Sequence, residues 1–252
     1  MKQIIDLNAD LGEDESPAGI ARDIAIMDII SSCNIACGGH AGSPATMQIM
    51  LEAAKSKGVA AGAHPSYPDR ERFGRASIDI SLEELEASLI EQFDQIRTLA
   101  ADSSTSLPHM KPHGALYNDA QDDPELSHLL VGLAEKAGVA IVGMAGSVLH
   151  KTAKARHIEF ISEAFIDRQY TDQGRLVPRR ETGAVISSEE ERIRQGLSLA
   201  RGDLLVARDG AKLQVEAQTL CLHSDSDGAL ETAKQMRQAL ELAGIAIGPV
   251  GR

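Results

Sequence analysis

Tryptophan is absent from this chain of 252 residues, and aromatic residues make up only 3% of it. Hydrophobic residues nevertheless reach 43%, so the core must be built from Ile, Leu, Val, Ala and Met. A chain of this length can bury a full core, as one α/β barrel or, less well, as two small domains. Because no internal repeat, low-complexity tract or linker-like stretch divides the sequence, we expect one barrel domain over residues 1–252.

Long apolar runs and clusters of positive charge are missing as well. No apolar run approaches the roughly 20 residues that a membrane-spanning helix needs, so we expect no membrane association. The net charge of -12, without a run of Lys or Arg, disfavours nucleic acid as a partner. The first residues reach the acidic Asp6 at once, which a secretory signal would not do. We therefore expect a soluble, cytoplasmic protein.

Cysteine is scarce, since the chain contains only Cys33, Cys37 and Cys221. An odd number of cysteines without a signal peptide argues against a disulfide framework. Cys33 and Cys37 have the spacing of half a metal site, but there is no second pair to complete it. We expect all three to be small buried thiols.

Nucleotide-binding motifs are absent too. Residues 38–44 are glycine-rich and lead into a predicted helix, whose first backbone amides could hold a carboxylate or a phosphate. They lack the lysine and the spacing of a P-loop, and they match no dinucleotide fingerprint. No other stretch has the P-loop pattern, so we expect no ATP site of that type on this chain.

The chain does contain six polar clusters, each just past a short apolar run and most of them separated by helix-like segments. They lie at residues 6–13, 34–40, 62–65, 111–114, 163–168 and 223–225. In a barrel of alternating strands and helices, the C-terminal ends of the strands converge on one mouth, where catalytic residues gather. Strand alternation also puts Asp6, Asn8 and Asp10 on one face, which is costly inside a barrel unless these groups are paired or liganded. The sequence therefore predicts an α/β barrel with a site at its mouth.

Hydrophobic periodicity, capping residues and turn residues predict the elements between these clusters. We expect strands at residues 3–8, 32–36, 59–63, 109–113, 139–143, 158–162 and 219–222. We expect helices at residues 20–30, 43–58, 81–101, 124–137, 147–155, 188–200 and 228–243. Ser43 and a capping box of Ser81 with Glu84 mark two helix starts. Asp209-Gly210 predicts a type I′ hairpin between residues 204–207 and 212–215, and residues 65–75 suit a mouth loop or lid.

Imidazole and carboxylate side chains in these clusters suit a divalent metal. Asp10, His40, His64 and His113 could hold zinc or a similar ion. They are scattered, however, and form no compact His-x-x-x-His signature. The alternative is that these histidines are hydrogen-bonded structural groups or bind the substrate.

His113 is alternatively a general acid or base, because a neutral imidazole near pH 7 suits proton transfer. Lys111 lies two residues earlier and would share a strand face with it, and a cation beside an imidazole lowers the pKa of both. Such a pair suits polarising a carbonyl or holding a carboxylate. The alternative is a solvated lysine beside a packing histidine.

An irregular arginine-rich stretch follows the fifth cluster. Arg168, Arg175, Arg179 and Arg180 surround Tyr170 in the sequence. Arginine forks suit carboxylates and phosphates. The alternative is a surface loop with solvated charges.

Five of these stretches, at residues 6–13, 34–42, 62–70, 111–118 and 163–168, together resemble the LamB/YcsF family. The resemblance covers nearly the whole chain and implies an irregular, seven-stranded, TIM-like (β/α) barrel related to polysaccharide deacetylases. It implies ATP-dependent opening of 5-oxoproline to L-glutamate, with partner subunits B and C that resemble an allophanate hydrolase and would supply the ATP site. Ser43, Ser224 and Asp227 depart from the family pattern, which has Asp, Gly and Pro there.

The resemblance also suggests roles for individual residues. Asp10 or Glu13 would position water or a metal, His113 would transfer protons, and Lys111 would stabilise an oxyanion. His40 and His64 would bind substrate or a metal, and Arg168 would hold a carboxylate. The other candidate substrate-binding residues are Asn8, Asn34, Asp69, Arg70, Asp167, Tyr170, Arg179 and His223.

Two other functions stay open at this point. One is a metal-dependent deacetylase of N-acetyl sugars, and the other is a non-catalytic substrate-carrier subunit. Assembly of identical chains into a homo-oligomer is likewise open.

Overall fold

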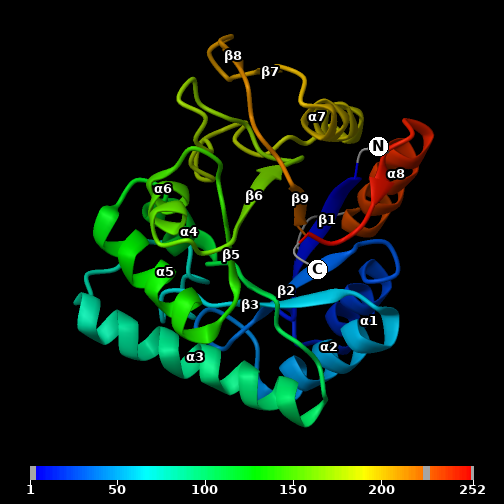
Figure 1. Ribbon diagram of the computed structural model, residues 1–252. Helices are drawn as coiled ribbons and strands as arrows, with labels where there is room; N and C mark the ends of the chain where they lie inside the picture. Colours follow the sequence, from blue (N-terminus) through cyan, green and yellow to red (C-terminus); the bar gives the residue numbers. More distant parts are fainter. Residues whose placement is uncertain (1–3, 224–227, 251–252) are drawn as a thin grey trace.

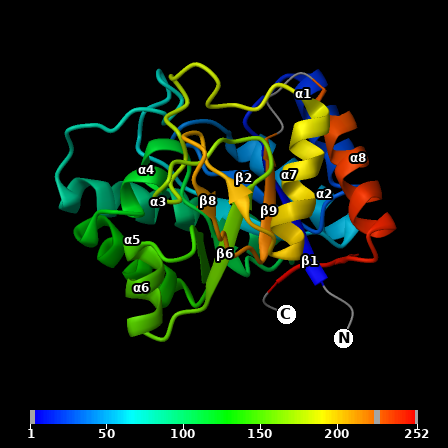
Figure 2. The same ribbon diagram turned by 90° about the horizontal axis from the view of Figure 1, so that it is seen from above.

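The computed structural model describes residues 4–223 and 228–250, in which seven parallel strands close into a barrel with the helices outside it (Figures 1 and 2). Each strand pairs with the next, and the last pairs with the first to close the ring. In this order the strands are β1 (Ile4–Leu11), β2 (Ser32–Ala36), β3 (Ala60–His64), β4 (His109–Met110), β5 (Ala140–Gly143), β6 (Phe160–Phe165) and β9 (Thr219–His223). The predicted seven-stranded barrel is confirmed.

Eight helices lie in the described part of the chain. They are α1 (Pro17–Ile26), α2 (Pro44–Lys57), α3 (Leu82–Asp102), α4 (Gly114–Ala120), α5 (Pro124–Ala137), α6 (Val148–Ala155), α7 (Glu189–Arg201) and α8 (Ala229–Leu242). Ser43 caps α2 by accepting a hydrogen bond from the backbone N–H of Thr46, as its position predicts. The capping box of Ser81 and Glu84 at the start of α3 is confirmed as well.

Several boundaries differ from the sequence prediction. Strand β4 ends at Met110 rather than residue 113, because Pro112 has no N–H for a ladder and the helix α4, which was not predicted, begins at Gly114. Strand β6 runs on to Phe165, so Glu163 lies inside the strand and not in the loop after it. Helix α1 starts three residues earlier than predicted and ends at Ile26. A short strand, β10 (Ala246–Ile247), extends the N-terminal end of β1 and was also missed.

The predicted hairpin exists, but its turn type is different. Strands β7 (Leu205–Val206) and β8 (Lys212–Leu213) are antiparallel and project from the barrel (Figure 1). A type I′ turn needs positive φ at both central residues, whereas only Gly210 has it, at 92°. The N–H of Gly210 donates to the carbonyl of Ala207, which gives a three-residue loop ending in a left-handed glycine. Asp209 accepts from the N–H of Ala211 and has no need of the left-handed region.

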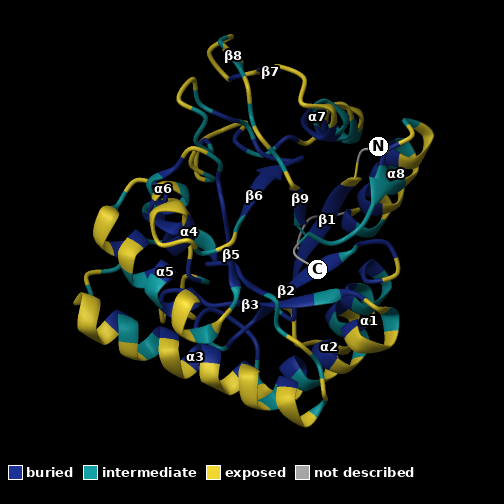
Figure 3. Ribbon diagram, in the orientation of Figure 1, coloured by how far each residue is buried: buried dark blue, intermediate teal, exposed yellow. Residues whose placement is uncertain are grey.

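The barrel strands are buried on both faces, as the dark strands in Figure 3 show. Apolar side chains such as Leu7 and Ala9 point outward to the helices, and polar ones fill the interior. Asp6 accepts hydrogen bonds from the hydroxyls of Ser32 and Thr219, at 2.6 and 2.5 Å. Asn8 donates to Thr219 at 2.6 Å. The predicted inward face of β1 is thus present, and its cost is offset by hydrogen bonds between strands.

All three cysteines are buried free thiols, as predicted. Within residues 4–223 and 228–250, no helix is long and apolar enough to cross a membrane.

Candidate active site at the barrel mouth

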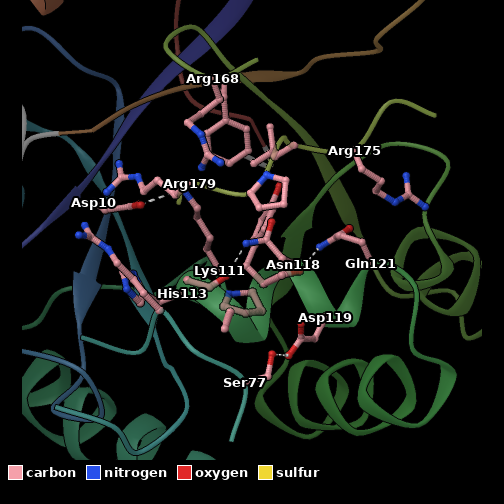
Figure 4. A pocket seen from close by; sticks show the side chains of 18 of the residues that line it. Asp10, Ser77, Lys111, His113, Asn118, Asp119, Gln121, Arg168, Arg175 and Arg179 are labelled. Carbon is pink, nitrogen blue, oxygen red and sulfur yellow. Dashed lines mark hydrogen bonds and ion pairs between the residues drawn. The ribbon is translucent and has the colours of Figure 1, made fainter. Parts of the chain in front are cut away.

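A cavity of about 460 Å³ opens at the C-terminal ends of the strands (Figure 4). Strand register explains why polar groups meet there, since Asp10 on β1 aligns with Asn34 on β2 and with His223 on β9. The cavity wall comes from strand ends, from α4 and from the irregular segment before α7. Its polar lining residues include Asp10, Glu13, His64, Arg75, Ser77, Lys111, His113, Tyr117, Asn118, Asp119, Gln121, Asp122, Arg168, Arg175, Arg179, Arg180 and His223.

Lys111 lies at the floor of this cavity between two carboxylates. Its Nζ is 2.9 Å from Asp10 Oδ1 and 2.8 Å from Glu163 Oε1, and only 2% of the residue is exposed. Burial lowers the pKa of Lys111, but the two carboxylates outweigh it and raise that pKa well above its usual value. The prediction that His113 would lower the pKa of Lys111 is wrong, because groups on β1 and β6 determine its charge. Lys111 is therefore a fixed ammonium group.

Three histidines and Glu13 form a cluster beside Lys111, which we call the histidine cluster. His64 Nε2 lies 3.0 Å from His113 Nδ1, and the rings of His40 and His113 stack with centroids 3.6 Å apart. Glu13 Oε1 is 3.2 Å from His40 Nε2 and 3.3 Å from His113 Nδ1. Burial first, and then the neighbouring histidines, hold the pKa of His113 well below its usual value. The predicted lowering for His113 thus has the right direction but a different cause.

His113 reaches the histidine cluster by a route that strand alternation did not predict. It is the N-cap residue of α4, so it shares no strand face with Lys111. Its Nε2 donates to the carbonyl of Phe73, at 3.0 Å, in the loop 65–75. Gly74 in the same loop accepts from the N–H of Ala115, at 2.9 Å. The predicted mouth loop therefore holds His113 in place.

A second histidine faces the cavity from the end of β9. His223 Nδ1 lies 2.7 Å from Asp167 Oδ2, and Asp167 is buried. Although burial raises the pKa of Asp167, the charge of His223 and its hydrogen bond bring that pKa below its usual value. Asp167 thus stays a carboxylate and fixes the orientation of His223.

Arginines line the outer part of the cavity. Arg168, Arg175, Arg179 and Arg180 come from the irregular segment that the sequence singled out, and Arg75 comes from the mouth loop. Arg175 pairs with Asp122, its Nε lying 3.0 Å from Oδ1, and Arg168 donates to the carbonyl of Val177. Their guanidinium groups make this part of the cavity positive in a chain whose net charge is -12.

Seven predicted site residues lie just outside the cavity. Asn8 and Asn34 lie deeper in the barrel, where Asn34 donates to Asp10 at 2.8 Å, and His40 lies behind His113. Asp167 lies behind His223, and the hydroxyl of Tyr170 accepts from the N–H of Phe165. Asp69 and Arg70 belong to the mouth loop, where Arg70 donates to two carbonyls of the glycine-rich stretch, those of Gly38 and Gly42. Asp225, Ser224 and Asp227 lie outside the described residues.

Some cavity residues were not predicted as site residues. Glu163 and Tyr117 lie close to Lys111, whose Nζ is 6.0 Å from the centre of the Tyr117 ring. Ser77, Asn118, Asp119 and Gln121 also line the wall. Glu163, Tyr117 and Asn118 lie within the conspicuous sequence stretches, but the unpredicted helix α4 concealed that the latter two face the mouth.

Comparison with known proteins agrees with this architecture. The sequence model of the LamB/YcsF family matches residues 5–252. The chain belongs to the LamB/YcsF family. It is 41% identical to the third of the numbered 5-oxoprolinase A subunits of Pseudomonas syringae pv. tomato, over 97% of this chain and 96% of that one. It is 42% identical to the first of those numbered in Agrobacterium fabrum, over 96% of each chain.

Solved structures extend the comparison to the fold. A lactam utilization protein from Thermus thermophilus superposes with a TM-score of 0.87 and 36% identity, covering 98% of this chain and 99% of that one. A family 4 carbohydrate esterase from Streptomyces lividans has a TM-score of 0.53 at 12% identity, over 99% and 96% of the two chains. The second likeness shows a shared fold alone. The family predicted from the sequence motifs is confirmed.

Proposed function

We propose that this chain is the A subunit of an ATP-dependent 5-oxoprolinase, which opens the cyclic amide 5-oxoproline to L-glutamate. The names of its relatives support this reading, as does the solved lactam utilization protein. The observation that carries the proposal is the fixed ammonium of Lys111 at the floor of an arginine-lined cavity. Such a site suits a small molecule that bears a carboxylate and a carbonyl oxygen that becomes negative during reaction.

The substrate has two polar ends, and the cavity offers a partner for each. Arg168 and Arg179 would hold its carboxylate, because guanidinium groups bind carboxylates through paired N–H donors. Lys111 would then face the lactam carbonyl and stabilise the oxyanion that forms when water attacks it. A lactam resists this attack through amide resonance, so the carbonyl must first be activated.

Activation would come from ATP, bound by partner subunits B and C, since this chain has no P-loop sequence. Phosphorylation of the carbonyl oxygen makes the carbon a better electrophile. One water then adds to that carbon, the ring C–N bond breaks, the nitrogen leaves with a proton, and phosphate is released. Asp10 or Glu13 would orient the water.

The proton for the leaving nitrogen needs a group that faces the cavity. The sequence suggested His113, but both of its ring nitrogens already face other groups, the carbonyl of Phe73 and the ring of His64. His223 lines the cavity and is oriented by Asp167, which is the arrangement of a base and its orienting carboxylate. We therefore assign proton transfer to His223, and the role of His113 stays a prediction.

The test is L-glutamate release from 5-oxoproline and ATP by the partner subunits, with and without this chain. We expect glutamate only when the chain is present, because the partners alone would activate the lactam without opening it. Glutamate release at an unchanged rate without the chain would contradict the proposal. Acetate release from N-acetyl sugars without ATP would instead support the deacetylase alternative.

The same assay separates a catalytic subunit from a carrier. His223→Gln should lower the rate of glutamate release by about 10²–10⁴-fold, the usual contribution of a general acid or base. His128→Gln changes an exposed histidine on α5 and should leave the rate unchanged. A carrier subunit would tolerate both substitutions equally.

A further inference from the structure

The histidine cluster contains two imidazole nitrogens that face each other without an evident proton between them. His64 Nδ1 lies 2.7 Å from the carbonyl oxygen of Lys111, and His113 Nε2 lies 3.0 Å from that of Phe73. A carbonyl oxygen only accepts hydrogen bonds, so both of these nitrogens carry the hydrogen. In neutral rings the opposite nitrogens, His64 Nε2 and His113 Nδ1, then present lone pairs to each other across 3.0 Å.

Two lone pairs at this distance repel unless a positive species joins them. A proton on one ring would serve, but it would place a charge in a buried group of three stacked or edge-packed imidazoles. Burial lowers the pKa of both His40 and His113 well below the usual value, which opposes that proton. A metal cation satisfies the same lone pairs and is what neutral imidazoles commonly bind.

The distances between donor atoms fit one coordination sphere. Glu13 Oε1, His40 Nε2, His64 Nε2 and His113 Nδ1 all lie within 4.8 Å of one another. The neighbour distances among them are 3.0, 3.2 and 3.3 Å. Ligands about 2.0–2.1 Å from a tetrahedral zinc ion are separated by about 3.3 Å, so the donors need move little.

The outer contacts of the rings also match a metal site. Metal-binding histidines usually donate their second N–H to a carbonyl or carboxylate, which fixes the ring and its tautomer. His64 and His113 both do so, toward the backbone of Lys111 and of Phe73. The other candidate group, Asp10, Cys221 and His223, does not compete, because Lys111 Nζ already lies 2.9 Å from Asp10 and 3.2 Å from Cys221.

We propose that Glu13, His40, His64 and His113 bind one divalent transition-metal ion, with zinc as the best match to a set of three imidazoles and one carboxylate. The sequence suggested Asp10 as the carboxylate of such a site. Glu13 takes that place because the oxygens of Asp10 accept from Lys111 and Asn34. Glu13, His64 and His113 also line the cavity, so an ion held there is accessible from it.

The experiment measures binding and does not depend on lactam chemistry. The full chain is stripped with a chelator, titrated with Zn²⁺ by calorimetry, and its metal content is then measured by mass spectrometry after gel filtration. We expect one Zn²⁺ per chain and a rise in Tm with added Zn²⁺, because an ion that binds only the folded state stabilises it. Absence of saturable binding by the wild-type chain would overturn the proposal.

Two variants locate the ion. Glu13→Gln keeps the shape of the side chain and His64→Ala removes one imidazole, and each should weaken Zn²⁺ binding by at least about 10-fold. His128→Ala, on the exposed face of α5, is the matched control and should bind like the wild type. Glu13→Gln needs no burial of a new group, so its fold should persist and circular dichroism checks this. Unchanged binding by a correctly folded Glu13→Gln would place the ion elsewhere and overturn the proposal.

Discussion

At the scale of single residues, Lys111 shows how a buried charge is maintained in the barrel. Removal from water favours the neutral amine, but carboxylates on two different strands lie within 3 Å of Nζ and keep it protonated. Tyr117 and Phe165 place their rings 6.0 and 5.4 Å from the same Nζ. The charge is thus fixed before any substrate enters, which is what stabilisation of an oxyanion requires.

Lys111→Met is expected to abolish glutamate release and to lower the free energy of unfolding by about 3–5 kcal/mol, because Asp10 and Glu163 would then be buried without their cation. Denaturant unfolding measures the second effect. The double variant Lys111→Met with Glu163→Gln removes one of the two carboxylates and should recover part of the stability without recovering activity. Restored turnover in that double variant would contradict the role of Lys111.

At the scale of elements, the start of α4 and the mouth loop depend on each other. Gly114 has φ of 58°, and a Cβ there would lie 2.4 Å from the carbonyl oxygen of Gly74. That carbonyl accepts from Ala115, and the neighbouring carbonyl of Phe73 accepts from His113. A side chain at residue 114 would therefore push the loop away from the histidine cluster.

Gly114→Ala should lower the free energy of unfolding by about 1–3 kcal/mol through backbone strain, and more through the clash with the loop. Gly138→Ala is a matched control, because Gly138 has φ of 69° at the end of α5 but a Cβ there meets nothing within 4 Å. Chemical denaturation of both variants isolates the contact with Gly74. If the two lose equal stability, the loop does not depend on that contact. We also expect glutamate release to fall only in Gly114→Ala.

At the scale of the whole molecule, closure of the barrel brings residues from opposite ends of the sequence together. Thr219 on β9 aligns with both Asp6 on β1 and Glu163 on β6. Its hydroxyl donates to Asp6 and accepts from Asn8, at 2.5 and 2.6 Å. This network lies beneath the cavity and joins the first strand to the last, so the position of Asp10 depends on it.

Thr219→Val keeps the shape of the side chain but removes a hydrogen-bond partner from both Asp6 and Asn8. We expect the free energy of unfolding to fall by about 1–3 kcal/mol, the usual cost of an unmet buried polar group. Urea denaturation measures it. Thr98→Val on the exposed face of α3 loses one hydrogen bond to the carbonyl of Asp94 and should change stability by no more than about 0.5 kcal/mol. A loss in Thr219→Val as small as that of the control would show that the closure network contributes little.

The sequence by itself determined the barrel class, the family and most of the residues that reach the mouth. Strand alternation is local, so Asp6, Asn8 and Asp10 could be placed inward from β1 alone. Caps such as Ser43 and Ser81 act within one helical turn and were equally readable. The cavity arginines could be found because they are close together in the chain.

Only the tertiary structure decided which groups act together. The partners of Lys111 lie on β1 and β6, and their effect on its pKa depends on distances across the closed barrel. The pairing of His223 with Asp167, and of Glu13 with three histidines from separate loops, likewise requires closure of the ring. Electrostatic and coordination effects act through space over a few ångströms, and local sequence patterns do not specify those distances.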